Sequence, residues 1–371
     1  MKTYRVIGLM SGSSLDGVDV ALCRIEEDGG RWRYEIEKAE CIPYPPKWRL
    51  RLQSLVLQNA VTYLKTDTFY GHYLGEVIRK FIQDNQLEAR VDFIASHGQT
   101  VFHQPENQMT SQIGDGASIC METGYPVICN FRTTDVALGG QGTPMAPIAD
   151  ILLFADFKFC LNLGGIANLS CELDNKIIGF DICGVNMVLN ALAGEIDLEM
   201  DKDGAIARSG MVNPELMNEL NAQWYYEKPY PKSIGGGWVT KIFLPTFRKY
   251  RIPVEDKLRT ATEHMAMQIA RDVKNVYANE YLNKDDSHSM LVTGGGAFNR
   301  FLLERINYHS PIPIVVPDPM TIKFKESLLT ALMGVLRYRG EVNMLASVTG
   351  ATADSCGGEV YLSTVHKMPV I

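Results

Sequence analysis

The sequence predicts an α/β protein built from two similar lobes with a cleft between them. The first observation is a repeated pattern, in which three strand-like segments occupy residues 5–37 and three more occupy residues 159–181. Helical segments follow each set of strands. The second observation is length, because 371 residues are enough for two domains of ordinary size. A stretch rich in glycine and proline, residues 137–147, is the expected boundary between them.

The first set of strands begins with a short apolar segment, Arg5–Met10. A second strand is predicted at Val18–Ile25, where alternate residues are apolar. In residues 32–37, aromatic and aliphatic side chains alternate with charged ones, which is typical of a half-exposed strand. A four-residue apolar repeat then predicts an amphipathic helix, with Phe69, Tyr73, Val77 and Phe81 on its buried face. Val91–Ser96 is the next expected strand.

The second set of strands repeats this order. The expected elements are strands at Phe159–Leu163, Ile166–Leu173 and Lys176–Asp181, with a hairpin turn at Asp174 and Asn175. Further elements are expected at Thr260–Leu282 (helix), Met290–Thr293 (strand), Phe298–Ile306 (helix), Ile312–Val316 (strand) and Lys325–Arg337 (buried helix). We expect one lobe to comprise residues 1–135 and 341–371, and the other to comprise residues 136–340.

Composition and charge exclude several classes of protein. A formal net charge of -7 without a basic run argues against nucleic acid or an anionic membrane surface as a partner. No apolar run approaches the ~20 residues of a membrane span, and the N-terminal apolar segment is too short for a secretory signal. The eight cysteines form no C-x-x-C pair and are expected to be reduced core residues. We therefore expect a cytoplasmic protein.

Glycine is the informative residue type, because glycine lets a backbone approach a ligand closely. Of 32 glycines, 14 lie in five loops: Gly8/Gly12/Gly17, Gly139/Gly140/Gly142, Gly164/Gly165, Gly235–Gly237 and Gly294–Gly296. The first loop has the glycine spacing of a P-loop, but Val18 and Asp19 stand where lysine and serine or threonine are required. Its side chains still offer hydroxyl donors at Ser11, Ser13 and Ser14 and carboxylates for Mg²⁺ at Asp16 and Asp19. The alternative is a polar hairpin turn.

The last glycine loop follows a strand and precedes a helix. Its G-x-G-x-x-N pattern, with Asp318 in the following segment, nearly matches the fingerprint for NAD. The pattern suits equally any nucleotide whose phosphates or adenosine rest on a glycine turn. An NAD-dependent enzyme therefore stays an alternative, although no helix is expected directly after the first glycine loop.

Candidate acids and bases are few. Asp181 leaves an apolar strand beside the expected cleft and is a candidate general base, or else a turn residue. Glu326 begins the buried helix, where it either acts in the site or stabilises the helix dipole. His97 and His103 are expected to flank a loop, and without a third ligand they do not indicate zinc. Arg132 and Asp135 are read as either a structural ion pair or substrate contacts.

Seven segments together resemble the anhydro-N-acetylmuramic acid kinase family. They are IGLMSGSSLDGVD (7–19), SHGQT (96–100), QIGDG (112–116), NFRTTDVALGGQGTPMAP (130–147), LNLGGIANLS (161–170), DKDGAIARSG (201–210) and TGGGAFN (293–299). The resemblance implies two ribonuclease-H-like lobes, each a βββαβα unit, in the actin-like ATPase fold with the nucleotide between them. It also implies a reaction that opens the 1,6-anhydro ring with water and phosphorylates the 6-oxygen, using ATP and Mg²⁺. The product is N-acetylmuramic acid 6-phosphate, an intermediate of cell-wall recycling, and a homodimer is plausible for the family.

The resemblance also assigns roles to residues of this chain. The ATP phosphates and adenosine are expected at Ser11, Gly12, Ser13, Ser14, Leu15, Asp16, Gly17, Val18, Gly164, Gly165, Gly294, Gly295 and Gly296. Asp181 matches the family's catalytic aspartate and would deprotonate the attacking water, while Glu326 would orient the sugar or the water. The sugar contacts are expected at His97, Gln99, Arg132, Asp135 and Asn186, and Mg²⁺ is expected at Asp16 and Asp19.

Two loops depart from the family pattern. After the catalytic Phe-Asp the family usually has Thr-Gly-Pro-Gly-Asn, where this chain has residues 182–186 as Ile-Cys-Gly-Val-Asn. The family's Thr-Gly-Arg-Glu appears here as Ile234-Gly235-Gly236-Gly237, so an arginine–glutamate pair is missing. These departures leave two alternatives open: a non-catalytic nucleotide or sugar binder on the same fold, and a kinase of a different amino sugar.

Overall fold

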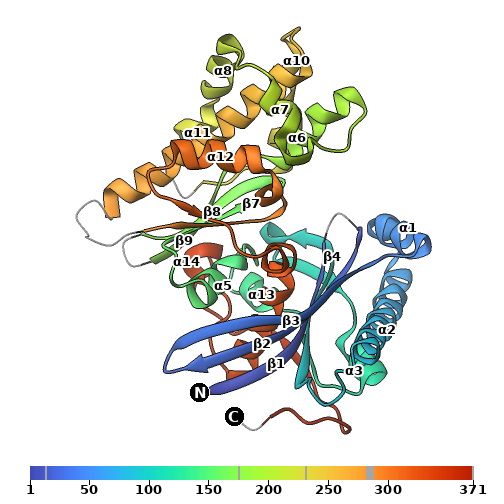
Figure 1. Cartoon of the computed structure of the whole chain (residues 1–371). Coiled ribbons are helices and arrows are strands. Elements are labelled where there is room, and N and C mark those ends of the chain that lie inside the picture. The colour runs from blue at the N-terminus through green and yellow to red at the C-terminus, as the bar shows by residue number, and fades with distance from the viewer. Residues whose placement is uncertain (13–14, 174–175, 230–231, 281–287, 370–371) are drawn as a thin grey trace. The chain divides into compact units, whose positions relative to one another are not determined.

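The computed structural model describes residues 1–12, 15–173, 176–229, 232–280 and 288–369. The chain divides into two compact units (Figure 1). Unit 1 comprises Met1–Leu153 and Phe324–Ile371, and unit 2 comprises Phe154–Lys323. The predicted turn at Asp174 and Asn175 lies outside the described residues.

Unit 1 is built on a mixed sheet in the order β12-β6-β4-β1-β2-β3, with β5 paired to β4. The strands are β1 (Lys2–Ser11), β2 (Gly17–Asp28), β3 (Arg31–Pro43), β4 (Phe93–Gln104), β5 (Met109–Ile113), β6 (Val127–Cys129) and β12 (Glu359–Tyr361). The neighbours β1–β2 and β2–β3 are antiparallel, whereas β4 is parallel to both β1 and β6.

The sheet of unit 2 repeats this topology in the order β11-β10-β7-β8-β9. Its strands are β7 (Phe159–Leu163), β8 (Ile166–Leu173), β9 (Lys176–Gly184), β10 (Met290–Thr293) and β11 (Ile314–Val315). The pairs β7–β8 and β8–β9 are antiparallel, and β10 is parallel to both β7 and β11. Each unit therefore has an antiparallel triplet followed by two parallel strands, which confirms the duplicated α/β fold that the sequence predicts.

Helices accompany both sheets. Unit 1 carries α1 (Pro46–Ser54), η1 (Leu55–Leu57), α2 (Ala60–Asp84), η2 (Pro105–Asn107), α3 (Gly116–Thr123), α4 (Thr133–Ala137), α5 (Ala146–Leu153), α14 (Ala346–Thr349) and all but the first turn of α13 (Pro319–Arg339). Unit 2 carries α6 (Asn186–Ala193), η3 (Gly194–Ile196), η4 (Lys202–Gly204), α7 (Ala205–Ser209), α8 (Pro214–Asn221), η5 (Trp224–Glu227), α9 (Gly236–Trp238), the π-helical η6 (Val239–Phe243), α10 (Leu244–Arg248), α11 (Val254–Glu280), η7 (Gly295–Phe298) and α12 (Arg300–His309).

The sheet of unit 1 is covered on both faces. Side chains of a strand alternate between its faces, and Ile7 and Leu9 of β1 share a core with Leu74 of α2. On the other face Gly8 meets α13 so closely that a Cβ there would lie 1.9 Å from the carbonyl oxygen of Ser327. Glycine at this position is therefore what lets α13 pack against the sheet.

The boundaries between the units lie at residues 153/154 and 323/324, whereas the sequence predicts them at 135/136 and 340/341. The difference consists of α5 and of all but the first turn of α13, which belong to unit 1. A second close approach fixes α13, because a Cβ on Gly334 would lie 2.7 Å from the Cβ of Ala95 in β4.

Three local expectations need correction. On α2 the buried face contains Tyr70, Leu74 and Ile78, whereas Phe69 is exposed, because the helix turns a tyrosine toward the core. His97 and His103 do not flank a loop; both lie on β4, which continues to Gln104. Cys41 is exposed instead of buried.

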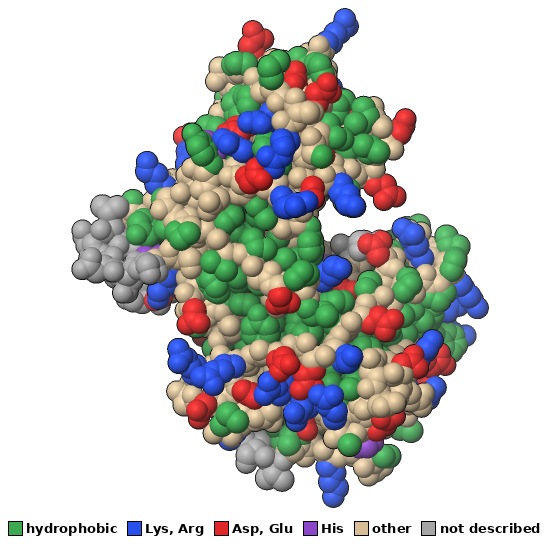
Figure 2. Space-filling view, in the orientation of Figure 1, with side chains coloured by type: hydrophobic (Ala, Val, Ile, Leu, Met, Phe, Trp, Pro, Cys, Tyr) green, Lys and Arg blue, Asp and Glu red, His purple; other side chains and the backbone are tan. Residues whose placement is uncertain are grey.

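The surface agrees with a modest net charge. Figure 2 shows basic and acidic side chains interspersed on the face in view. Over the described residues, none of the helices has the length and apolar character that crossing a bilayer requires.

Candidate active site

Asp181 lies on β9 at an irregularity in the sheet. Asn168 of β8 pairs with Asp181 and Ala167 pairs with Cys183, which leaves Ile182 as an extra residue on β9. Such a bulge re-aims neighbouring side chains and is frequent beside active sites. The strand runs on to Gly184, so Asp181 is within it and not at its end.

The carboxylate of Asp181 is held by a segment distant in the sequence. Its Oδ2 accepts hydrogen bonds from Ser233 Oγ at 2.8 Å and from the N–H of Ile234 at 2.9 Å. Its backbone N–H donates to the carbonyl oxygen of Lys232 at 2.9 Å, and its carbonyl accepts from the hydroxyl of Tyr225 at 2.7 Å. Burial raises the pKa of Asp181, and the two hydrogen bonds to Oδ2 oppose that rise. A fixed carboxylate with a raised pKa is suited to general-base chemistry.

Two glycine turns meet in unit 2. Parallel neighbours β7 and β10 bring their carboxyl ends together, with Thr293 in register with Asn162. Gly294 has a φ of +82°, and a Cβ there would lie 2.5 Å from Oδ1 of Asn162, so this position requires glycine. The exposed Gly295 has more space, because a Cβ there would lie 3.5 Å from its nearest neighbour, Nδ2 of Asn186.

Asn186 joins these turns. Its side-chain amide donates to the carbonyl oxygen of Leu163 at 3.1 Å, and its backbone N–H donates to that of Gly164 at 3.2 Å. Asn186, which the sequence suggested as a sugar contact, therefore lies with Gly164, Gly165 and the turn at 294–296, which are predicted nucleotide residues. Cys183 of the altered 182–186 run is a buried core residue, where burial raises the pKa of its thiol.

The first glycine loop connects β1 to β2 in unit 1. Ser11 pairs in register with the fully buried Val18. The Ser11 hydroxyl lies 2.8 Å from the Tyr70 hydroxyl. Leu15 has a φ of +56° and donates its N–H to the carbonyl oxygen of Gly12. The loop is therefore a strand–turn–strand connection, and Ser11 and Val18 can offer a ligand only their backbone. Ser13 and Ser14 lie outside the described residues.

Charged side chains of unit 1 gather near this loop. Asp16 is exposed, whereas Asp19 is half-buried on β2. Burial raises the pKa of Asp19, hydrogen bonding to Cys41 lowers it, and the Asp16 carboxylate adds to the rise. Burial and the Asp19 carboxylate likewise raise the pKa of Glu326, against the opposing charges of Arg132 and Lys325. Within the described residues, no three His, Cys, Asp or Glu side chains have the arrangement of a metal site.

His97 and Arg132 form a pair. Nε of Arg132 donates to Nε2 of His97 at 3.1 Å, and the other ring nitrogen, Nδ1, lies 2.9 Å from the carbonyl oxygen of Gly98. Burial and the Arg132 charge lower the pKa of His97 to about 3, so the ring is neutral, with its proton on Nδ1. Burial lowers the pKa of Arg132 to about 10, which leaves it charged.

The two remaining predicted sugar contacts are buried. Gln99 on β4 donates its amide weakly to the carbonyl oxygen of Thr100 at 3.5 Å, while its Oε1 has no hydrogen-bond partner among the described residues. Asp135 does not form the suggested ion pair with Arg132. Its Oδ1 accepts from Thr349 Oγ1 and its Oδ2 from the N–H of Gly142, each at 2.7 Å.

Asp135→Ala is expected to destabilise unit 1 by about 2–4 kcal/mol, because two buried donors lose their acceptor. Urea titration of the free energy of unfolding measures this loss. Asp84→Ala, at an exposed position of α2, is the matched control and should change stability by less than about 0.5 kcal/mol. Equal stabilities for the two variants would contradict a structural role for Asp135.

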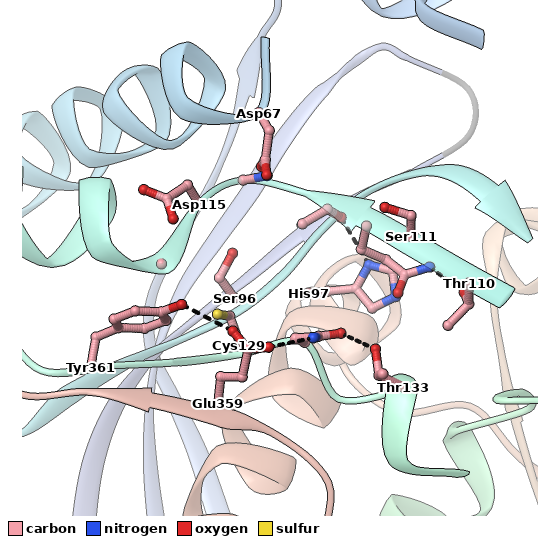
Figure 3. Close-up of a pocket in the computed structure, with 15 residues that line it drawn as sticks. Asp67, Ser96, His97, Thr110, Ser111, Asp115, Cys129, Thr133, Glu359 and Tyr361 are labelled. Carbon is pink, nitrogen blue, oxygen red and sulfur yellow. Dashed lines mark hydrogen bonds between the residues drawn. The ribbon is translucent and has the colours of Figure 1, made fainter. Parts of the chain in front are cut away.

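Beside His97 lies a polar pocket of about 240 Å³ (Figure 3). Its lining includes the carboxylates of Asp67, Asp115 and Glu359, and among the residues that the structure describes no lysine or arginine lines it. Glu359 accepts hydrogen bonds from Asn130 and Tyr361, and Oδ1 of Asp67 accepts from the N–H of Gly114. Such a lining favours hydroxyl or amide groups and disfavours phosphate. None of the three carboxylates was predicted as a site residue: Asp115 lies in the QIGDG motif, whereas Asp67 and Glu359 lie in no motif of the sequence.

Each unit thus brings one set of predicted residues together. Unit 1 holds the first glycine loop, Asp19, His97, Arg132 and Glu326, and unit 2 holds Asp181, Asn186 and the two glycine turns. The Gly235–Gly237 run begins α9, directly after the segment that contacts Asp181.

Comparisons with known proteins agree with the motifs. Residues 4–363 match the profile of the family described as Anhydro-N-acetylmuramic acid kinase. A curated protein of that name from Sulfurimonas denitrificans is 33% identical, with 96% of this chain and 98% of that protein covered. The one from Aliivibrio fischeri is also 33% identical, covering 96% and 99%. Among solved structures, a ligand-bound xylulose kinase from Lactobacillus acidophilus is similar at 9% identity and a TM-score of 0.45, covering 97% and 94%. The chain belongs to the anhydro-N-acetylmuramic acid kinase family.

Proposed function

We propose that this protein is an ATP-dependent kinase that opens the 1,6-anhydro ring of anhydro-N-acetylmuramic acid and phosphorylates its 6-oxygen. The observation that carries the proposal is the Asp181 carboxylate, which is fixed by two hydrogen bonds on a bulged strand in a chain of this family. Family membership favours this reaction over the non-catalytic alternative and over NAD chemistry.

Asp181 would act as the general base. It removes a proton from a water whose oxygen bonds to the anomeric carbon, and the bond between that carbon and the 6-oxygen breaks. The released 6-oxygen then bonds to the γ-phosphorus of ATP, and ADP leaves. Holding the reactants in line supplies most of the rate in phosphoryl transfer. The hydrogen bonds from Ser233 and Ile234 leave Oδ1 of Asp181 as the oxygen to receive the proton.

The sugar would bind residues of unit 1. Muramic acid carries a lactyl carboxylate, and Arg132 is a cation whose Nε is fixed by His97. Arg132 forms no ion pair among the described residues, although the charge of Glu326 acts on it, so its terminal nitrogens can bind a carboxylate of the ligand. Glu326, whose pKa is affected by the charges of Asp19 and Arg132, would orient the sugar or the water. The unpartnered Oε1 of Gln99 and the acceptors of the adjacent pocket suit hydroxyl and amide groups.

The nucleotide would rest on glycine turns. Gly164, Gly165 and Gly294–Gly296 suit adenosine and phosphate, and the backbone of residues 11–18 suits the other phosphates. Asp16 and Asp19 fit Mg²⁺ as oxygen donors, because the Asp16 carboxylate adds to the raised pKa of Asp19 and a bound cation would offset that effect. When bound, Mg²⁺ neutralises phosphate charge. A cytoplasmic location and a homodimer remain predictions.

Oxygen labelling tests the reaction. In ¹⁸O-water with ATP, the 6-phosphorylated product should carry the label on its anomeric hydroxyl and none in its phosphate. Unlabelled product incubated in the same water corrects for anomeric exchange. Label in the phosphate, or phosphorylation with the anhydro ring intact, would contradict the coupled mechanism. Turnover of another amino sugar alone would favour the different-substrate alternative, and ligand-induced thermal shifts without turnover would favour a non-catalytic binder.

A further inference from the structure

One short segment makes three hydrogen bonds to Asp181. Residues 232–234 belong to no helix or strand, and they contact both the backbone and the carboxylate of Asp181. Because an irregular segment has no hydrogen-bonded ladder of its own, something else must fix its position.

The Lys232 side chain supplies that anchor. The side chain is only 2% exposed, and its Nζ lies 2.9 Å from Oδ2 and 3.3 Å from Oδ1 of Asp272. Asp272 belongs to the long helix α11, and its side chain is 6% exposed. The same Nζ lies 5.3 Å from the ring centre of Tyr225, whose hydroxyl donates to the carbonyl oxygen of Asp181. The Lys232 side chain therefore links the 232–234 segment to α11 through Asp272, and it also packs on Tyr225, which contacts Asp181.

A buried ion pair adds little net stability compared with apolar side chains of the same size, because both charges must be desolvated. Its directional geometry can instead define one position for the backbone that carries it. We infer that Lys232 and Asp272 are positioning residues that hold the Ser233 and Ile234 donors on the Asp181 carboxylate. The inference rests on the proposed role of Asp181.

The consequence is a change in proton affinity. Hydrogen bonds to a carboxylate favour its charged form, so losing the Ser233 and Ile234 donors would raise the pKa of Asp181. Other titratable groups around the pair are Cys183 of β9 and Tyr225 and Tyr226 of η5, while Arg271 of α11 acts on Asp272. None of these donates a hydrogen bond to the Asp181 carboxylate in the described structure, so they do not replace the lost donors.

Lys232→Met tests the inference in the full chain. We expect kcat to fall by about tenfold or more and the acidic limb of the pH profile of kcat/KM to move up by about one pH unit, with KM for ATP unchanged. The matched control is Lys257→Met, which removes another buried lysine of unit 2. Its partner is Glu195, at 2.7 Å, and neither residue contacts Asp181. In the control the acidic limb should stay at its wild-type position.

Hydrogen exchange gives a readout that does not need activity. The amides of Asp181 and Ile234 should exchange at least about tenfold faster in Lys232→Met than in Lys257→Met. If Lys232→Met does not fold, Asp272→Asn keeps the size of the partner while removing its charge, and it should move both readouts in the same direction.

The outcomes separate two failures. If Asp181→Asn is inactive while Lys232→Met keeps the wild-type acidic limb and amide exchange, the positioning inference is overturned and the role of Asp181 stands. If Asp181→Asn keeps its activity, the proposed base is wrong, and the amide exchange alone then decides whether the pair holds the segment.

Discussion

Replacing Asp181 with asparagine is expected to lower kcat by about 10³-fold or more, because an amide cannot accept the proton of the attacking water. The substitution keeps the size of the side chain and an oxygen for the Ser233 and Ile234 donors, so the local fold should survive. ATP binding, measured by calorimetry, should be unchanged, because the glycine turns lie on other segments. Steady-state ADP release with anhydro-N-acetylmuramic acid measures the loss.

The pH profile of the wild-type protein adds to this test. The base must be ionised, and burial raises the pKa of Asp181. Activity should therefore fall as the pH drops through a value above the ordinary carboxylate range of about 4. Asp197→Asn, at an exposed position of unit 2, is the control and should keep both the rate and the profile. Turnover by Asp181→Asn near the wild-type rate would place the base elsewhere.

The sequence alone predicted the fold because its strands have simple periodicities. Alternation and apolar runs located the three-stranded segments, and their duplication predicted two similar α/β lobes. The membership of α13 in unit 1 could not be read in this way. It depends on Gly8 of β1 and on Gly334 of α13 itself, whose importance becomes visible only when the helix packs against strands more than 200 residues earlier in the chain. Similarly, β12 joins the first sheet from the far end of the chain.

The candidate site was predictable in its reacting groups but not in their supports. Asp181 is noticeable because it follows an apolar run, whereas its donors Ser233 and Ile234 lie 52 and 53 residues further along, in a stretch without periodicity. The suggested pairing of Arg132 with Asp135 followed from their proximity in the sequence. In the fold, Arg132 pairs with His97 and Asp135 with Thr349, which lies 214 residues away.

Arg132→Leu should show the second large effect. If the guanidinium binds the lactyl carboxylate of the sugar, its loss should lower kcat/KM for anhydro-N-acetylmuramic acid by about 10²-fold or more, since charge-assisted bonds to a partly buried partner are strong. The substitution also removes a charge that favours ionised Glu326 and a donor to His97. A fall in rate by itself would therefore not identify the partner of Arg132.

A substrate without the lactyl group separates these contributions. With 1,6-anhydro-N-acetylglucosamine, the wild-type protein should already lack the Arg132 contact, so Arg132→Leu should lower kcat/KM for it by only a few-fold. The ratio of the two losses isolates the interaction between the side chain and the carboxylate, as a double-mutant cycle does. His97→Gln is a useful companion, because it disturbs the support of Arg132 and leaves its charge. We expect it to affect the muramic acid substrate more than the glucosamine one. Equal losses for the two substrates in Arg132→Leu would show that Arg132 acts through Glu326 or His97, and that the lactyl group binds elsewhere.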